Sequence, residues 1–310
     1  MNREIPIFFS SDDNYLPFLD VALGSLIENA SKEYNYRIII LNTGISQSNE
    51  ATVRLRERDG FRIEFVDITE RLSGIKSRLK DVYHFSLVTY YRLFIGSLFP
   101  EYDKVIYLDC DLVVLGDISR LYNTELGNNI IAAAPEAFVR GTPEFREYAD
   151  KALGVNPDKY VNAGVLLMNL SEFRRQRIEE KFIRIISEYD FDLLDPDQAY
   201  LNYLCAGKIH ELPNGWNKEP LPTPCEGDKS IVHYALYKKP WQYGDVADGE
   251  HFWRYAARSP FYGKICEIRD SFDGECRARK ESEAVRIIEQ AKEIVASDNT
   301  FKKRLSALVF

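Results

Sequence analysis

The sequence predicts an α/β protein in which a mostly parallel sheet is flanked by helices and followed by a C-terminal helical extension. Short β-rich runs alternate with helical patterns from the N-terminus onward. The apolar run VIYLDCDLVV at residues 105–114 is typical of a buried strand, and residues 261–310 carry apolar side chains near helical spacing. Strands that alternate with helices indicate βαβ units around a mostly parallel sheet.

The first part of the chain contains the clearest alternation. Strands are expected at residues 5–11, 36–43, 62–68 and 104–109. The helices between them are expected at residues 17–30, 46–60 and 84–99, and Gly60 is expected to end the second helix. Each strand and the helix after it form one half of a βαβ unit.

The second part of the chain adds strands, a long helix and a loop-rich stretch. Strands are expected at residues 129–135 and 160–170, a helix at 171–189, and a turn with a short helix at 195–205. Prolines and glycines interrupt residues 206–250. The C-terminal helical pattern rests on Val285, Ile288, Ile294 and Val295.

Composition limits the kind of partner. The net charge of −8 predicts no broad basic surface, so no nucleic-acid partner is expected. The N-terminus has no long apolar segment after its charges, so it is not expected to be a signal peptide. No stretch reaches the roughly 18 apolar residues of a membrane span. Five scattered cysteines without a CxxC pair fit a reduced, cytoplasmic location.

Two aspartates interrupt the apolar run at residues 105–114. Asp109 and Asp111 project to the same side of an extended chain, and they fall at the carboxyl end of a strand, where α/β sheets bind ligands. Two adjacent carboxylates repel each other unless a cation lies between them, and oxygen ligands suit Mg²⁺ or Mn²⁺. An isolated DxD more often serves a turn or a helix cap. The flanking apolar runs favour the metal site here.

A second group of polar residues lies in HYALYKKPW at residues 233–241. His233 follows a short predicted strand, so its imidazole could complete a carboxylate metal site, and Lys239 supplies a cation for a phosphate. The alternative is a surface loop that packs on Trp241. Together with the DxD, this segment could hold a metal-bound diphosphate.

Five motifs occur in one order along the chain. They are SSDDNY (10–15), HFSLVTYYRL (84–93), YLDCDLVV (107–114), YVNAGVLLMNL (160–170) and HYALYKKPW (233–241). In this order they resemble glycosyltransferase family 8, which includes bacterial lipopolysaccharide galactosyl- and glucosyltransferases and, more distantly, glycogenin. The resemblance implies a GT-A fold, a Rossmann-like mixed sheet. It also implies transfer of glucose or galactose from a UDP-sugar to a glycan, glycolipid or glycoprotein acceptor, with Mn²⁺ (or Mg²⁺) and retention of configuration.

The resemblance also implies a domain division. Residues 1–260 would form the GT-A domain, with a nucleotide-binding half at about 1–115 and an acceptor-side half at about 116–260. Residues 261–310 would form the helical extension. The tail FKKRLSALVF could contact an anionic membrane, although a surface helix packed on the domain is the simpler interpretation of so few basic residues.

Roles for single residues follow from the resemblance. The metal ligands would be Asp109, Asp111 and His233, and the residues near the reacting carbon would be Asp197 and Gln198. The donor site would contain Ser10, Asp12, Asn14, Tyr15, His84, Arg92, Asp109, Cys110, Glu136, Asn162, Ala163, Gly164 and Lys239. Within that set, Asp12 and Asn14 would contact uracil and ribose, with Tyr15 stacking nearby. His84 and Lys239 would contact the diphosphate, Arg92 the donor sugar, and residues 162–164 would line the sugar pocket.

Several of these residues also have ordinary structural interpretations. Asp12 and Asn14 could cap the helix that begins near Pro17. Arg92 on a helix face could pair structurally. Asn162 and Gly164 could serve a strand bulge, and Asp197 with Gln198 could simply open a helix.

Two positions depart from the family pattern. Leu236 stands where the last motif has a glycine, which lets the backbone approach the diphosphate. Glu136 stands where relatives often carry an aspartate near the sugar hydroxyls, and its longer reach bears on donor choice.

Two rival functions fit parts of the sequence. A strand followed by DxDxV also opens phosphatases of the haloacid dehalogenase type, but such a motif normally lies near the start of the domain. A catalytically silent nucleotide-sugar binding protein is the other rival, and the presence of Asp109, Asp111, His233 and Lys239 argues against it. For the transferase, attack by the acceptor on the face of the leaving phosphate is preferred, with Asp197 as the alternative nucleophile.

Overall fold

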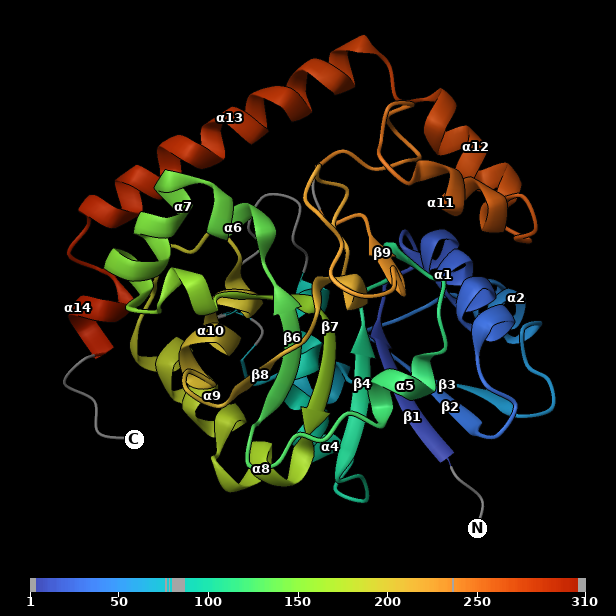
Figure 1. The fold of residues 1–310 in the computed structure, drawn as a ribbon, viewed down its shortest axis with the longest axis horizontal. Coiled ribbons are helices and arrows are strands. Elements are labelled where there is room, and N and C mark those ends of the chain that lie inside the picture. Colours follow the sequence, from blue (N-terminus) through green and yellow to red (C-terminus); the bar gives the residue numbers. More distant parts are fainter. Residues whose placement is uncertain (1–3, 76, 78, 80–86, 236, 306–310) are drawn as a thin grey trace.

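A central seven-stranded sheet organises the protein, whose computed structural model describes residues 4–75, 77, 79, 87–235 and 237–305 (Figure 1). Side by side, the strands are β3 (Phe61–Asp67), β2 (Asn35–Asn42), β1 (Glu4–Ser10), β4 (Lys104–Leu108), β7 (Val161–Asn169), β6 (Ile131–Pro135) and β8 (Ile209–Glu211). Strands β3, β2, β1 and β4 run parallel, β7 is antiparallel to both of its neighbours, and β8 is parallel to β6. The predicted mixed, mostly parallel sheet is confirmed.

A small second sheet follows the DxD. Strand β5 (Leu112–Val114) pairs antiparallel with β9 (Ile231–His233), and Leu112 lies opposite His233. The short strand predicted before His233 is therefore present. The apolar residues after Asp111 form a separate strand rather than a continuation of β4. This pairing brings two segments that are distant in sequence to the end of β4.

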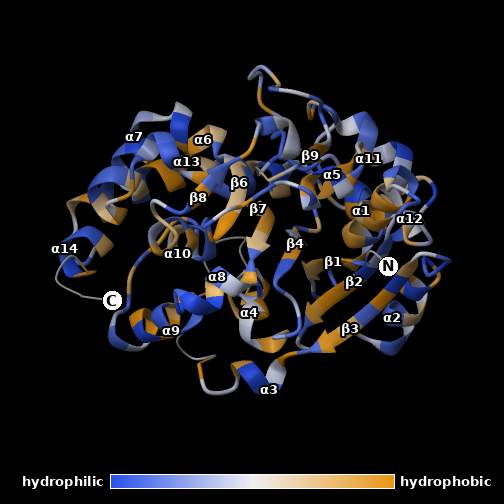
Figure 2. Ribbon diagram, turned by 60° about the horizontal axis from the view of Figure 1, so that its bottom comes forward, coloured by the Kyte–Doolittle hydropathy of each residue, from blue (hydrophilic) through white to orange (hydrophobic). Residues whose placement is uncertain are grey.

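Helices cover both faces of the sheet. On one face, α1 (Leu16–Asn29) packs with β1 and β4 in a buried cluster that includes Ile7 and Ile106. On the other face, Phe8 and Tyr107 pack with residues of η2 (Leu87–Phe94) and α9 (Ile178–Glu188). Because both faces are covered, the central strands β1 and β7 are apolar and buried along almost their whole length. Orange prevails over much of the sheet in Figure 2.

The remaining helical elements connect the strands and form the C-terminal extension. They are α2 (Gln47–Arg54), α3 (Thr69–Leu72), α4 (Ile95–Leu98), α5 (Ile118–Tyr122), α6 (Ala137–Gly141), α7 (Pro143–Glu147), η3 (Tyr148–Leu153), η4 (Pro157–Lys159), α8 (Leu170–Arg175), α10 (Pro196–Leu204), η5 (Asn214–Trp216), α11 (Gly249–Ala256), α12 (Tyr262–Asp270), α13 (Gly274–Ala296) and α14 (Phe301–Leu305).

Three predicted helices differ from the observed ones. Helix α2 ends at Arg54, and Gly60, with φ of 81°, lies in the turn that leads into β3. The helix predicted at 84–99 is a 3₁₀ helix, η2, followed by the short α4, while residues 84–86 lie outside the described residues. The segment Val88 to Tyr91 is rich in β-branched and aromatic residues, which are weak α-helix formers.

The long helix predicted at 171–189 is also divided. Arg177 adopts a left-handed conformation, with φ of 55°, between α8 and α9. The break lets Phe173 on α8 and Phe182 on α9 pack in one core cluster. Helical propensity continues across the break, so the division comes from tertiary packing rather than from a local stop signal.

The C-terminal helices form an arch over the sheet (Figure 1). Helix α13 spans the top of the molecule between α12 and the group formed by α7 and α14. Its last turns are anchored, because Ala291 and Ile294 are buried in the core cluster that also contains Tyr148 and Phe145. At the other end, Arg277 lies over the ring of Tyr243, 4.9 Å from its centroid. The arch therefore joins the two sides of the molecule.

The described part of the C-terminal tail is packed against the domain. Phe301 and Leu305 of α14 are buried, while Lys302 pairs with Asp150 and Lys303 with Asp298. These contacts favour the packed-helix interpretation of residues 301–305, and residues 306–310 lie outside the described residues. None of the described helices has the length and apolar character needed to span a bilayer.

One buried ion pair ties α1 to its surroundings. Asp20 is fully buried and lies 2.7 Å from Nη2 of Arg56, and the hydroxyl of Ser259 donates to the same carboxylate oxygen at 2.6 Å. The same helix carries a surface pair, in which Glu28 lies 2.6 Å from Arg258. Burying an ion is costly unless its partners are in place. Loss of one partner should therefore destabilise the protein more in the buried pair than in the surface pair.

Replacing Asp20 with alanine is expected to lower the free energy of unfolding by about 3 kcal/mol, because Arg56 loses its buried partner. The matched change on the same helix, Glu28→Ala, is expected to cost about 0.5 kcal/mol. Urea unfolding of both variants checks the difference. Equal losses would contradict the argument.

Candidate active site

The candidate site is a cavity of ≈ 780 Å³ at the carboxyl ends of β1 and β4. Its walls come from the loop after β1, the DxD segment, the start of β7, the first turn of α10, the segment after β9, and α13. The cavity therefore lies at the sheet edge where the sequence predicted ligand binding.

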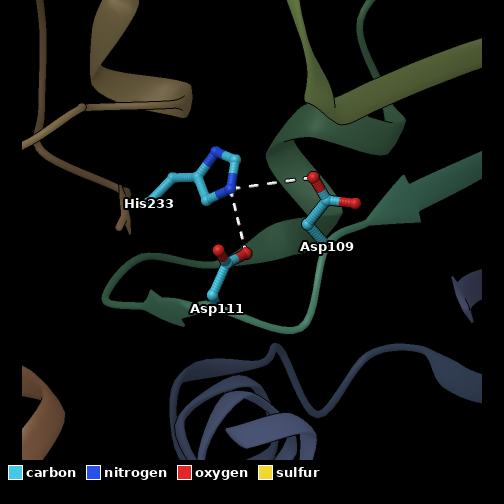
Figure 3. A group of neighbouring side chains, drawn as sticks. All are labelled: Asp109, Asp111 and His233. Atoms are coloured by element: carbon cyan, nitrogen blue, oxygen red, sulfur yellow. Dashed lines mark hydrogen bonds and ion pairs between the residues drawn. The ribbon is translucent and has the colours of Figure 1, made fainter. Parts of the chain in front are cut away.

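The two DxD carboxylates and His233 meet in this cavity (Figure 3). Oδ1 of Asp111 lies 3.1 Å from Nε2 of His233, and Oδ2 of Asp109 lies 3.7 Å from the same nitrogen. One ligand atom from each of the three residues lies within 4.8 Å of the others. The structure thus brings together the three metal ligands expected from the sequence.

A hydrogen bond behind His233 orients its ring. Nδ1 lies 2.8 Å from Oδ1 of Asn217, and Nδ2 of Asn217 donates to Oδ1 of Asn162 at 2.8 Å. Because an amide oxygen only accepts, Nδ1 carries the proton, and in the neutral ring Nε2 presents its lone pair to Asp109 and Asp111. A lone pair facing two carboxylates is repulsive unless a cation joins them.

Gly164 lets the ring of His233 and the carboxylate of Asp109 pack closely against β7. A Cβ on Gly164 would overlap Cε1 of His233 and would lie 2.7 Å from Oδ2 of Asp109. The carbonyl of Gly164 also accepts the backbone N–H of Asp109 at 2.8 Å, which holds the strand against the DxD. Ala133 of β6 lies opposite Leu166, but Pro135 lies opposite Val161, so the extra residues of this irregularity lie in β7 around Asn162 and Gly164, as their bulge interpretation required. The donor set of two carboxylates and an imidazole fits a divalent cation.

Lys239 is the cation that faces this cluster. Its ammonium lies 2.6 Å from Oδ2 of Asp111 and also donates to the carbonyl of Tyr234. Burial favours the neutral form of Asp111, but the charge of Lys239 outweighs it and lowers the pKa of that carboxyl. Asp111 is therefore held as a carboxylate, which is the form that binds metals.

Arg92 links the DxD to the first turn of α10. It is 2% exposed and lies 2.8 Å from Oδ1 of Asp109 and 3.1 Å from Oδ2 of Asp197, and it donates to the carbonyl of Ala163. Its guanidinium also lies over the ring of Tyr107, at 4.2 Å from the centroid. The structural pairing considered for Arg92 is thus observed, and its partners are residues of the candidate site.

The pocket beside the metal cluster is lined by amides and carboxyls. Nδ2 of Asn162 donates to Glu136 at 2.6 Å, and Oε1 of Gln198 accepts the backbone N–H of Ala163 at 2.9 Å. The amide of Gln198 donates to Asp195 at 2.8 Å, so both ends of this side chain are fixed. Asp197 and Gln198 also open α10, as their structural interpretation required.

Sequence reasoning missed two residues that line this pocket and one that lies behind His233. They are Asp195, Asn217 and Glu219, all of which are buried or partly buried around the predicted set. Burial and the neighbouring Glu136 carboxyl raise the pKa of Glu219 well above its ordinary value. The sequence signal was weak: Asp195 precedes Pro196, and the other two residues lie in the loop-rich stretch, where no periodicity marks buried positions.

The loop after β1 brings a second group of predicted residues to the cavity. Oδ1 of Asp12 accepts the backbone N–H groups of Asn14 and Tyr15 at 2.9 and 3.0 Å, which shapes the turn into α1. Asp12 and Tyr15 line the cavity, as do Ser10 and Cys110, whose thiol donates to the Ser10 carbonyl at 3.1 Å. Asn14 is exposed and lies outside the described lining.

Two residues of the predicted site cannot be placed. His84, expected near the diphosphate, and Leu236, which replaces the family glycine, both lie outside the described residues. Lys239 and His233, on either side of Leu236, are placed in the cavity.

The fold and the cluster together define a class of protein: α/β chains with an acidic metal-type site at the strand ends. Residues 6–245 match the family described as glycosyl transferase family 8, and the chain belongs to this family. A putative glycosyltransferase of Haemophilus influenzae is 30% identical over 77% of this chain and 74% of its own length. The lipopolysaccharide 1,2-glucosyltransferase of Escherichia coli is 27% identical over 76% of this chain and 72% of its own.

Solved structures confirm the fold. The galactosyltransferase LgtC, solved with donor and acceptor sugar analogues, superposes with a TM-score of 0.68 at 28% identity, over 84% of this chain and 100% of its own. The fold is therefore of the GT-A type, as the family resemblance implied. The phosphatase alternative, which rested on the DxD stretch alone, is not favoured.

Replacing Gly164 with alanine is expected to abolish tight binding of Mn²⁺, because the new methyl group displaces His233 and Asp109. Calorimetric titration with Mn²⁺ checks this, with circular dichroism to show that the variant is folded. The control is Gly263→Ala on α12, where a Cβ meets nothing within 4 Å. Unchanged Mn²⁺ affinity in the Gly164 variant would contradict the assignment.

Asp195 is expected to make stability depend on pH. Burial raises its pKa to about 7, so the native state holds a proton that the unfolded chain loses near pH 4. This contribution is complete at low pH and is lost as the pH rises through 7. Between pH 5 and pH 8, the unfolding free energy of the unmodified chain should therefore fall by about 3 kcal/mol relative to that of the Asp195→Asn variant, whose amide does not titrate. Denaturant titrations at both pH values measure it, and a constant difference would contradict the prediction.

Proposed function

We propose that this glycosyltransferase moves a hexose, glucose or galactose, from a UDP-sugar to a saccharide acceptor, with a divalent cation and with retention of configuration. The observation that carries the proposal is the cluster of Asp109, Asp111 and His233 beside Lys239 in one cavity. This arrangement supplies ligands for a cation and a separate positive charge for a diphosphate.

Asp109, Asp111 and His233 would hold the cation, with Mn²⁺ as the expected metal and Mg²⁺ as the alternative. When bound, the ion supplies Lewis-acid stabilisation of the charge that develops on the leaving diphosphate. The chain's own contribution at this point is Lys239, a fixed cation already buried at the cavity wall.

The nucleotide would lie toward the loop after β1. Asp12 faces this part of the cavity and can accept from a base or a ribose, and Tyr15 offers an aromatic face. Ser10 and Cys110 line the wall between this loop and the DxD.

The donor sugar would lie in the amide-lined pocket. Glu136, Asn162 and Gln198 line the cavity. Asn162 donates to Glu136, while Gln198 accepts from the N–H of Ala163 and donates to Asp195, so the directions of these polar atoms are fixed. Such fixed groups recognise hydroxyls selectively, because an unmatched hydroxyl leaves a buried partner unpaired. Glu136 in place of the shorter aspartate makes this pocket the part of the site that sets donor choice.

The position of Asp197 favours same-face attack over a covalent intermediate. Its carboxylate is 4% exposed and is paired with Arg92, so it is less available as a nucleophile. Gln198 is a poor nucleophile but a suitable hydrogen-bond partner near the reacting carbon. A glycosyl adduct trapped on Asp197 and detected by mass spectrometry would overturn this mechanism.

Removal of the metal or of one ligand is expected to stop transfer. Chelation should reduce UDP release from UDP-glucose or UDP-galactose to background, and added Mn²⁺ should restore it. Asp111→Asn should lower turnover by about 10³-fold, because the site loses a charged ligand.

The control for the ligand variant is Asp248→Asn. Asp248, Glu250 and His251 form a second, more exposed group of the same residue types. The turnover and the Mn²⁺ affinity of the Asp248→Asn variant should match those of the unmodified chain. Phosphate release from phosphomonoesters without UDP release from any UDP-sugar would contradict the proposal.

A further inference from the structure

The cavity extends beyond the groups that a UDP-sugar would use. Its polar part lies at the ends of β1 and β4, while another part continues between α6 and the arch formed by α13. Six apolar side chains line this second part, namely Phe138, Val139, Leu194, Ala284, Val285 and Ile288, and α13 also presents Ile287 and the charged Lys280, Glu281 and Glu283 to the cavity. The six apolar side chains carry no hydrogen-bonding group, so they offer no partners to sugar hydroxyls or phosphates.

One wall of this apolar part is a stripe on α13. Glu281, Ala284, Val285 and Ile288 follow the spacing i, i+3, i+4 and i+7, which places them on one helix face, and all four line the cavity. Ala291 and Ile294 continue toward the buried core, which fixes the rotation of the helix. Val285 is nevertheless 62% exposed. It shares this exposure with Phe138 across the cavity, so apolar surface on two walls is accessible to a ligand.

The opposite wall contains an exposed aromatic ring. Phe138 on α6 is 37% exposed and packs against Phe145, with ring centroids 5.0 Å apart. Phe138 follows Glu136, which faces the sugar pocket, by two residues, and the N–H of Phe138 donates to the Glu136 carboxylate at 3.1 Å. The apolar part of the cavity therefore begins directly beside the proposed sugar pocket.

We propose that the space between α6 and α13 is the acceptor subsite, and that it takes an acceptor whose sugar carries an apolar group of alkyl or aryl type. This inference rests on the proposed function, since an acceptor must reach the donor sugar. A wholly polar glycan would leave the six apolar side chains uncovered, whereas an alkyl or aryl group covers them. Burial of such a group contributes binding in proportion to its apolar area.

The test compares glycosides that differ only in the apolar group. Methyl, n-octyl and phenyl glycosides of glucose and galactose are titrated into the full chain by calorimetry, below the concentration at which octyl glycosides form micelles. Titrations are made with and without Mn²⁺ and UDP. The octyl or phenyl glycoside should bind at least about tenfold more tightly than the methyl glycoside, with a negative heat-capacity change. Tighter binding of the octyl glycoside would identify a lipid-like chain as the apolar group of the acceptor, and tighter binding of the phenyl glycoside would identify an aromatic group.

Two variants on opposite walls locate the effect. Val285→Asp places a charge on the α13 stripe, and Phe138→Ser removes the exposed ring. Each should reduce the preference for the apolar glycoside to less than about threefold. The matched control is Ser282→Asp, which adds the same charge to the exposed outer face of α13 and should keep the full preference.

The outcomes separate the two proposals. Equal affinity for methyl and apolar glycosides, or a preference that both wall variants keep, overturns the acceptor subsite. Absence of UDP binding and of UDP release counts against the proposed donor chemistry instead. Because the glycosides are also titrated without Mn²⁺ and UDP, the apolar preference is measured in either case.

Discussion

Negative charge gathered at the end of β4 is the constraint on which the rest of the structure depends. Asp109 and Asp111 leave a strand that is buried on both faces, and Asp197 approaches from α10. Unpaired buried carboxylates would cost several kcal/mol each. Arg92 and Lys239 offset this cost, and each comes from a different part of the chain, while His233 from β9 completes the group of possible metal ligands. The positions of η2, α10 and β9 are thus tied to the charge balance of one site.

The counter-charges are not equivalent. Arg92 is enclosed by Asp109, Asp197, the carbonyl of Ala163 and the ring of Tyr107, so groups of the protein itself balance its charge and accept its hydrogen bonds. Lys239 and His233 line the cavity and face space that a ligand can occupy. In the proposed function, Arg92 maintains the shape of the site, while Lys239 pairs with the negative charge of the diphosphate. Lysine suits that role because its compact ammonium on a flexible stem can change partners.

Local patterns in the sequence predicted most strands of the main sheet and the pair of aspartates, but not the separate strand β5 or the short strand β8. Apolar runs mark β1, β4 and β7, and the i, i+2 spacing of Asp109 and Asp111 places both carboxylates on one side of the chain. Features that depend on distant contacts were not predictable in this way. The break at Arg177 lies in a segment with continuous helical propensity, and Asn217 is an ordinary loop residue until its amide meets Nδ1 of His233. Glu219 likewise becomes a site residue only because Glu136 lies opposite.

The pairing of β5 with β9 has a consequence for how the protein folds. His233 reaches Asp111 across 122 residues of chain, and the antiparallel register of Leu112 with His233 sets that contact. Contacts that close so long a loop carry a large entropic cost and form after local ones. The metal cluster therefore becomes complete only when the intervening segment, including β6 to β8, has folded into place. During synthesis, a ribosome-bound chain that has not yet exposed β9 would present the two aspartates without their histidine, so in the proposed function the metal site is completed by folding of the domain and does not direct it.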